Sequence, residues 1–192
     1  MSTLLSHCAY VLAGGPGSGR HPGFAHDLPK PLSPIMLKLF PKHHTWKEHN
    51  NWHQQAYGAV MVRPDGKFLL REPSKHFDGY AWTFAKGKAD FKGEHPTAVA
   101  HREVAQETGH TGDIIGRLPG NYSTPNSNSN FYMMTPRSFD ESRMDQETQG
   151  LRWVGYHEAK ELIGQSKNPN GRARDLAILD SAQKYIDKYK VR

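Results

Sequence analysis

The central stretch of the chain, residues 87–110, reads GKADFKGEHPTAVAHREVAQETGH. Pro96 suits the first turn of a helix, where no hydrogen bond from its nitrogen is needed, and Gly109 suits the residue that follows the last turn. We therefore predict a helix between these two residues. Glu103 and Glu107 are four residues apart within it, so their carboxylates lie on the same helix face.

This carboxylate pair has two interpretations. Two like charges at this spacing repel each other by roughly 0.2–0.5 kcal/mol in an isolated helix, and on a solvated helix face they have no further role. A cation between Glu103 and Glu107 would remove the repulsion. Mg²⁺ typically binds one or two carboxylates together with substrate phosphates, so the pair is also a candidate magnesium site.

The residues around the pair favour the metal site. Glu94 is followed, after seven residues, by Arg-Glu-Val at 102–104, and Gly109 lies two positions after Glu107. This spacing resembles the signature of the Nudix hydrolase family, which reads Gly, five residues, Glu, seven residues, then Arg-Glu-aliphatic-x-Glu-Glu-x-Gly-aliphatic. Because the pattern is long and chemically mixed, it is more specific than any of its glutamates alone.

Three positions depart from the family pattern. Six residues separate Gly87 from Glu94 rather than five, so the loop before the helix is one residue longer. Gln106 replaces the first Glu of the Glu-Glu pair and removes one carboxylate that could bind metal or act as a base. His110 stands where an aliphatic residue is usual.

The resemblance implies an α/β fold, a Nudix-type α/β/α sandwich with a mixed sheet. It also implies a hydrolase that cleaves the diphosphate linkage of a nucleoside diphosphate derivative, with Mg²⁺ or Mn²⁺ as cofactor. By resemblance, the metal ligands are Glu103, Glu107 and the backbone carbonyl near Gly87. Arg102 would pair with Glu94 and hold the loop against the helix, which is a structural role.

Three further residues are candidates for contact with the substrate or for catalysis. Lys86 and Lys88 can meet phosphate oxygens, or they are exposed loop lysines. Glu147 opens the sequence ETQGLRWV, which resembles the family's approach to its last strand. Since a carboxylate from this loop often serves the family as ligand or general base, Glu147 is a candidate catalytic residue. The alternative is a solvated loop glutamate.

Two observations concern the substrate. Pro125 lies fifteen residues after His110, a distance typical of ADP-ribose-cleaving members, although a loop proline also has ordinary structural explanations. Residues 82–88, WTFAKGK, resemble instead the Phe-Pro-Lys-Gly-Lys approach of dinucleoside-polyphosphate and diphosphoinositol-phosphate hydrolases, with Ala85 in place of Pro. ADP-ribose and dinucleoside polyphosphates are both candidate substrates. A nucleoside triphosphate pyrophosphatase and a Nudix domain that binds nucleotides without hydrolysis remain alternatives.

Composition limits the partners and the compartment. The chain has 192 residues, a net charge of +6 and one cysteine, Cys8, which excludes an internal disulfide and fits a reducing compartment. The sequence has no apolar run of the about 20 residues that a membrane span needs, and residues 1–13 lack the features of a secretory signal. We expect a cytoplasmic protein without a membrane partner. The positive charge suits a nucleotide or a nucleic acid.

Residues 1–54 are predicted to form an irregular segment rich in Gly, Pro and His, followed by the Nudix domain at 55–192. Residues 14–20, GGPGSGR, follow an apolar run as a P-loop would. A P-loop ends in Gly-Lys-Ser/Thr, whereas this chain has Arg20 and His21 at those positions. The histidines of the segment show no regular ligand spacing, so we favour solvated histidines over a zinc site.

Hydrophobic patterning predicts the order of the remaining elements. A buried strand is expected at 56–62, with 67–71 pairing back on it as a hairpin. Further strands are predicted at 82–84, 114–118, 131–135 and 151–154, with polar loops at 119–130 and 136–149. Helices are predicted at 157–163 and 173–190.

Overall fold

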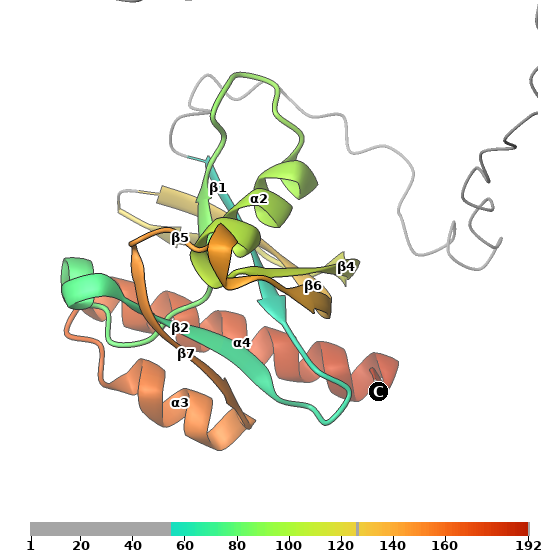
Figure 1. The fold of residues 1–192 in the computed structure, drawn as a ribbon. Helices are drawn as coiled ribbons and strands as arrows, with labels where there is room; N and C mark the ends of the chain where they lie inside the picture. Colours follow the sequence, from blue (N-terminus) through green and yellow to red (C-terminus); the bar gives the residue numbers. More distant parts are fainter. Residues whose placement is uncertain (1–54, 126, 192) are drawn as a thin grey trace, which may run out of the picture. The chain divides into compact units, whose positions relative to one another are not determined.

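The structure is a computed structural model that describes residues 55–125 and 127–191 (Figure 1). The segment predicted for residues 1–54, with its P-loop-like stretch and its histidines, lies outside the described residues. Within the described residues, no helix is both long enough and apolar enough to cross a membrane.

A five-stranded sheet forms the centre of the domain. Its strands are β1 (Gln55–Met61), β3 (Lys86–Lys88), β4 (His110–Arg117), β5 (Tyr122–Thr124) and β6 (Ser127–Phe139). The order is β3-β1-β6-β4, and β5 also pairs with β6. The pair β1–β6 is parallel and the other pairs are antiparallel, which confirms the predicted mixed sheet.

The strand β1 is buried on both faces, because successive side chains of a strand point to opposite sides. Val60 packs into one core cluster with residues of α3 (Tyr156–Gly164) and α4 (Pro169–Tyr189). Ala59 and Met61 pack into a second cluster with residues of α2 (Pro96–Thr108). Helices therefore cover both faces of the sheet (Figure 1), and the predicted α/β/α sandwich is confirmed.

Local signals set both ends of α2. The His95 side chain accepts a hydrogen bond from the Thr97 N–H (3.3 Å), and Pro96 occupies the first turn. Gly109 adopts a left-handed backbone conformation (φ +66°) and donates its N–H to the Ala105 carbonyl (2.9 Å). A side chain is strained in this conformation, so glycine suits the position. The predicted ends of the helix are confirmed.

The predicted hairpin between the first two strands is wrong. The strand β2 (Phe68–Pro73) pairs antiparallel with β7 (Thr148–Val154) in a separate two-stranded sheet. Only a single bridge, between Val62 and Phe68, joins it to the end of β1. The reason is that β1 already pairs with β3 on one edge and β6 on the other, so no edge of β1 is free for β2.

The strand predicted at 82–84 is also wrong. Thr83 forms one isolated bridge with Arg71, and the regular strand begins only at Lys86, where β3 pairs with β1. The displacement matters for the site, because it makes Lys86, Gly87 and Lys88 a strand edge beside α2 rather than part of a loop.

The two predicted polar loops contain more structure than expected. Residues 119–130 include β5 and the start of β6, and the Ser123 hydroxyl donates to the Asn128 side chain across this hairpin (2.7 Å). Residues 136–149 include the end of β6 and a short 3₁₀ helix, Glu141–Arg143. Serine and asparagine here bond to each other across strands, so a composition typical of loops did not predict a loop. The other predicted strands and helices are present within a few residues of their expected ends.

Candidate functional site

Glu103 projects from α2 onto the backbone of β3. A Cβ atom at residue 87 would overlap the Glu103 carboxyl group, so glycine is required there for the carboxylate to approach the strand. The Glu103 side chain retains only 13% exposure. Burial raises the pKa of this carboxyl; Arg102 opposes the shift, and the charges of Asp90 and Glu147 add to it. Glu103 is thus a partly desolvated carboxylate against the backbone of Gly87.

Arg102 joins α2 to the loop that precedes it. Its guanidinium donates to both carboxylate oxygens of Glu94 (3.2 Å each) and to the Lys88 carbonyl (2.8 Å). It also donates to Glu103 (2.7 Å) and to the side-chain oxygen of Gln106 (3.2 Å). Hydrogen bonds from Arg102 lower the pKa of Glu94. Strand, loop and helix therefore meet at one guanidinium, in the arrangement that the sequence predicted for this pair.

Glu107 lies one turn further along α2 and is 3% exposed. One carboxylate oxygen accepts the Lys86 backbone N–H (2.8 Å) and the other forms an ion pair with Arg71. Burial raises the pKa of Glu107 to about 8, although Arg71 and the Lys86 N–H oppose the shift. The positive charges beside the two glutamates are therefore guanidinium groups, Arg102 for Glu103 and Arg71 for Glu107.

Arg71 was not predicted from the sequence. It lies in β2, and its guanidinium also donates to the Glu147 carbonyl (3.2 Å) and the Thr148 hydroxyl (3.1 Å). It therefore links β2, β7 and α2 beneath the site. The available signal was an arginine directly after the apolar run Phe68-Leu69-Leu70, which is unusual where a strand continues into a core.

The other predicted residues are divided between the site and its surroundings. Glu147 is exposed, but its charge acts on Glu103, so the two carboxylates belong to one region. Lys86 is half-buried and Lys88 is exposed. Pro125 is exposed in the turn between β5 and β6, and that turn by itself explains a proline at this position.

Oxygen donors dominate this region, which we call the carboxylate site: Glu103, Glu107, Glu147 and the backbone at Gly87. Carboxylate and carbonyl oxygens are the ligands that Mg²⁺ and Mn²⁺ prefer, so the donor set fits a hard divalent cation. Among the described residues, no three His, Cys, Asp or Glu side chains converge as metal ligands. Both oxygens of Glu107 already have partners, so a cation at Glu107 would share this carboxylate with Arg71 or replace Arg71 beside it.

The buried state of Glu107 predicts a pH effect on stability. A carboxyl whose pKa is raised in the folded state favours the protonated form there, so its contribution to stability is lost as pH rises from about 4.5 to about 8. In buffer with a chelator, we expect wild type to lose more than about 1.4 kcal/mol, the value of one pKa unit, relative to Glu107→Gln over this range. Urea unfolding at several pH values measures the difference. Parallel pH profiles for the two proteins would contradict the prediction.

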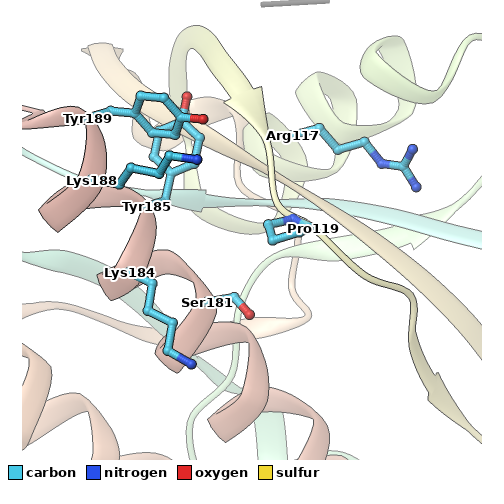
Figure 2. A pocket seen from close by; sticks show the side chains of 7 residues that line it. All are labelled: Arg117, Pro119, Ser181, Lys184, Tyr185, Lys188 and Tyr189. Carbon is cyan, nitrogen blue, oxygen red and sulfur yellow. The ribbon is translucent and has the colours of Figure 1, made fainter. Parts of the chain in front are cut away.

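A second concave region lies elsewhere, between α4 and the segment that follows β4. It is a cavity of about 380 Å³, lined by Arg117, Pro119, Ser181, Lys184, Tyr185, Lys188 and Tyr189. Figure 2 shows the two tyrosines beside Lys188, while the Arg117 guanidinium points away from them. Lys188 lies 5.1 Å from the centre of the Tyr189 ring. No predicted site residue lines this cavity, so it is separate from the carboxylate site.

Comparison with known proteins gives a family and a fold. The model of the NUDIX domain family matches residues 52–175. A NUDIX hydrolase from Nitrosomonas europaea has a TM-score of 0.54 at 19% identity, over 69% of this chain and 89% of that one. A C. elegans Ap4A hydrolase binary complex has a TM-score of 0.53 at 19% identity, over 69% and 98%. No curated protein matches the chain. At this identity, the two structures show a shared fold.

Proposed function

Because the chain belongs to the NUDIX domain family of pyrophosphohydrolases, we propose that it cleaves the diphosphate linkage of a nucleoside diphosphate derivative in a reaction that depends on a divalent cation. The observation that carries this proposal is the position of Glu103, whose carboxylate takes the space that a side chain at Gly87 would fill. A partly desolvated carboxylate held against a strand backbone can bind a cation that faces a phosphate.

The residues of the carboxylate site would have two roles, cation binding and proton transfer. Glu103 and the Gly87 carbonyl would hold the cation, with Glu107 as a further ligand. When bound, Mg²⁺ or Mn²⁺ would neutralise phosphate charge and lower the pKa of a water molecule. Glu147, which is exposed and whose charge acts on Glu103, would accept a proton from the attacking water. Its backbone is held by hydrogen bonds from Ser74 and Arg71 to its carbonyl, so the exposed side chain extends from a fixed position before β7.

Arg102 and Glu94 support this arrangement without contacting the substrate. Arg102 holds Glu103, Glu94 and the Lys88 carbonyl at the same time, so it fixes the distance between α2 and the edge of β3. Groups that orient a ligand in this way affect metal affinity or activity by roughly 10–100-fold.

Among substrates, we favour a dinucleoside polyphosphate over ADP-ribose. The sequence at 82–88 resembles that group of hydrolases, and one similar structure is described as an Ap4A hydrolase. The turn between β5 and β6 explains Pro125, which leaves the ADP-ribose alternative without a structural argument. A cytoplasmic location, which fits the single cysteine, is part of the same proposal.

The test is product analysis across diadenosine polyphosphates, ADP-ribose and dGTP, each with Mg²⁺, with Mn²⁺ and with EDTA. We expect turnover only with a cation, and a higher kcat/KM for diadenosine polyphosphates than for dGTP. A clear preference for dGTP would indicate a nucleoside triphosphate pyrophosphatase. Ligand binding without any product would indicate a nucleotide-binding domain that does not hydrolyse its ligand.

A further inference from the structure

A row of polar side chains extends across the sheet from the carboxylate site. Gly87 of β3 is paired with Tyr57 of β1, and Tyr57 is paired with Asn130 of β6. Directly paired residues of neighbouring strands project to the same face of a sheet. Because the open side of Gly87 faces the Glu103 carboxyl group, the Tyr57 and Asn130 side chains share the face of the sheet on which Glu103 lies.

Arg117, at the end of β4, completes the row. Its guanidinium donates to the Asn130 side-chain oxygen (2.6 Å). It also lies near Tyr57, since burial raises the pKa of the Tyr57 hydroxyl and the charge of Arg117 opposes this shift. Figure 2 shows the guanidinium pointing away from the tyrosines of the cavity beside α4, so the charged end of Arg117 does not serve that cavity. We call Tyr57, Asn130 and Arg117 the sheet-face row.

The sheet-face row is accessible beside α2. Ala59, two residues after Tyr57 on β1, packs in a buried cluster with residues of α2, whereas Tyr57 and Asn130 are half-buried and Arg117 is exposed. Neighbouring strands are about 4.8 Å apart, so Asn130 lies roughly 10 Å from Gly87 across the sheet. A planar group over the Tyr57 ring would therefore lie between the carboxylate site and the pair of Asn130 and Arg117.

The free groups of Asn130 and Arg117 are hydrogen-bond donors. Since a guanidinium can only donate, Arg117 occupies the carbonyl oxygen of Asn130 and leaves the amide N–H groups for a ligand. The guanidinium has five N–H donors, and this bond uses one of them. A base edge with two adjacent acceptors fits these groups. Guanine presents such an edge in N7 and O6, whereas adenine presents the acceptor N7 beside the donor N6.

We propose that the sheet-face row binds the base of the substrate nucleotide and selects guanine over adenine. This inference rests on the proposed function and narrows it to guanine nucleotides. With the phosphate at the cation beside Glu103, the base would stack on the Tyr57 ring, and its N7 and O6 would accept hydrogen bonds from Asn130 and Arg117. A preferred dinucleoside polyphosphate would carry guanine at this end.

The test measures nucleotide binding, which does not require turnover. GMP and AMP are titrated separately into the full-length protein by calorimetry, in buffer with Mg²⁺. We expect wild type to bind GMP at least about tenfold more tightly than AMP, the discrimination typical of one bidentate contact to a base. Arg117→Met should bind the two nucleotides with affinities within about twofold of each other, because stacking does not depend on which base is bound.

Two further variants separate base selection from other effects. Arg137→Met is the matched control, because Arg137 is an exposed arginine on the same strand as Asn130 and pairs with Asp113; it should keep the wild-type preference for GMP. Tyr57→Leu should weaken the binding of GMP and AMP by similar factors, since every base has a face that can stack on an aromatic ring.

Each outcome decides the inference. Equal affinities of wild type for GMP and AMP would overturn it, as would the absence of binding or a GMP preference that Arg117→Met retains. Initial rates with diguanosine and diadenosine tetraphosphate test the proposed function separately. A GMP preference that is lost in Arg117→Met, in a protein that cleaves neither compound, would support the base site while contradicting the proposed function. Cleavage without any preference between the bases would contradict this inference alone.

Discussion

Replacing Glu103 by Gln is expected to lower kcat/KM by at least about 100-fold, the loss typical of removing a group that acts directly on the reacting phosphate. Gln keeps the shape and helix propensity of Glu but cannot supply the negative charge. The carboxylate lies directly against the backbone of Gly87, so the change removes charge at the point where the proposed cation faces the phosphate. Initial rates with a diadenosine polyphosphate and Mg²⁺ measure the effect.

Two measurements make this prediction decisive. Glu161→Gln is the matched control, because Glu161 is exposed on α3 and the same change there should alter the rate by no more than about twofold. Circular dichroism and calorimetric titration with Mn²⁺ should show that Glu103→Gln is folded and binds the metal more weakly. If the kcat/KM of Glu103→Gln is within about threefold of the wild-type value, this carboxylate does not take part in the reaction.

The sequence predicted the carboxylate helix well because its signals are local. Pro96 and Gly109 act through backbone conformation at their own positions, and both ends of α2 are where these residues indicate. Glu103, Glu107 and Arg102 were found through a fixed spacing on that helix. The pairing of Arg102 with Glu94 followed from the same short stretch and is present.

The errors concern partners that are distant in the sequence. The hairpin prediction for β2 used a tight turn, and that turn exists, since the Arg63 N–H bonds to the Lys67 carbonyl (3.0 Å). A turn does not show that both edges of β1 are already paired with β3 and β6. Arg71 was missed for the same reason, because its role depends on β2 lying beside β7 and beneath α2. Side-chain chemistry at one residue does not determine which element packs against it.

The buried role of Asp175 was also not predicted, because the hydrophobic pattern of α4 was used only to place the helix. It lies on the buried face of α4, one helical turn before Ile178 and Leu179, and is itself 0% exposed. A carboxylate on an apolar helix face needs a partner, and the adjacent Arg174 together with Thr83 supplies it. The helix at 173–190 was predicted from its hydrophobic patterning, and an aspartate on the apolar face was the available sign of a buried polar network.

Replacing Asp175 by Ala is expected to lower the free energy of unfolding by about 3–5 kcal/mol, the usual effect of removing one partner of a buried ion pair. Arg174 would keep its buried charge with no carboxylate beside it, and the Thr83 hydroxyl would lose its acceptor. Urea unfolding of the two proteins, at the same pH and with EDTA present, measures the difference in stability.

Asp180→Ala on the same helix is the matched control for this change. Asp180 is half-buried and accepts one hydrogen bond, from the Tyr156 hydroxyl (2.7 Å), so its loss should lower stability by only about 1 kcal/mol. If the free energies of unfolding of Asp175→Ala and Asp180→Ala differ by less than about 1 kcal/mol, Asp175 does not compensate the buried Arg174 charge.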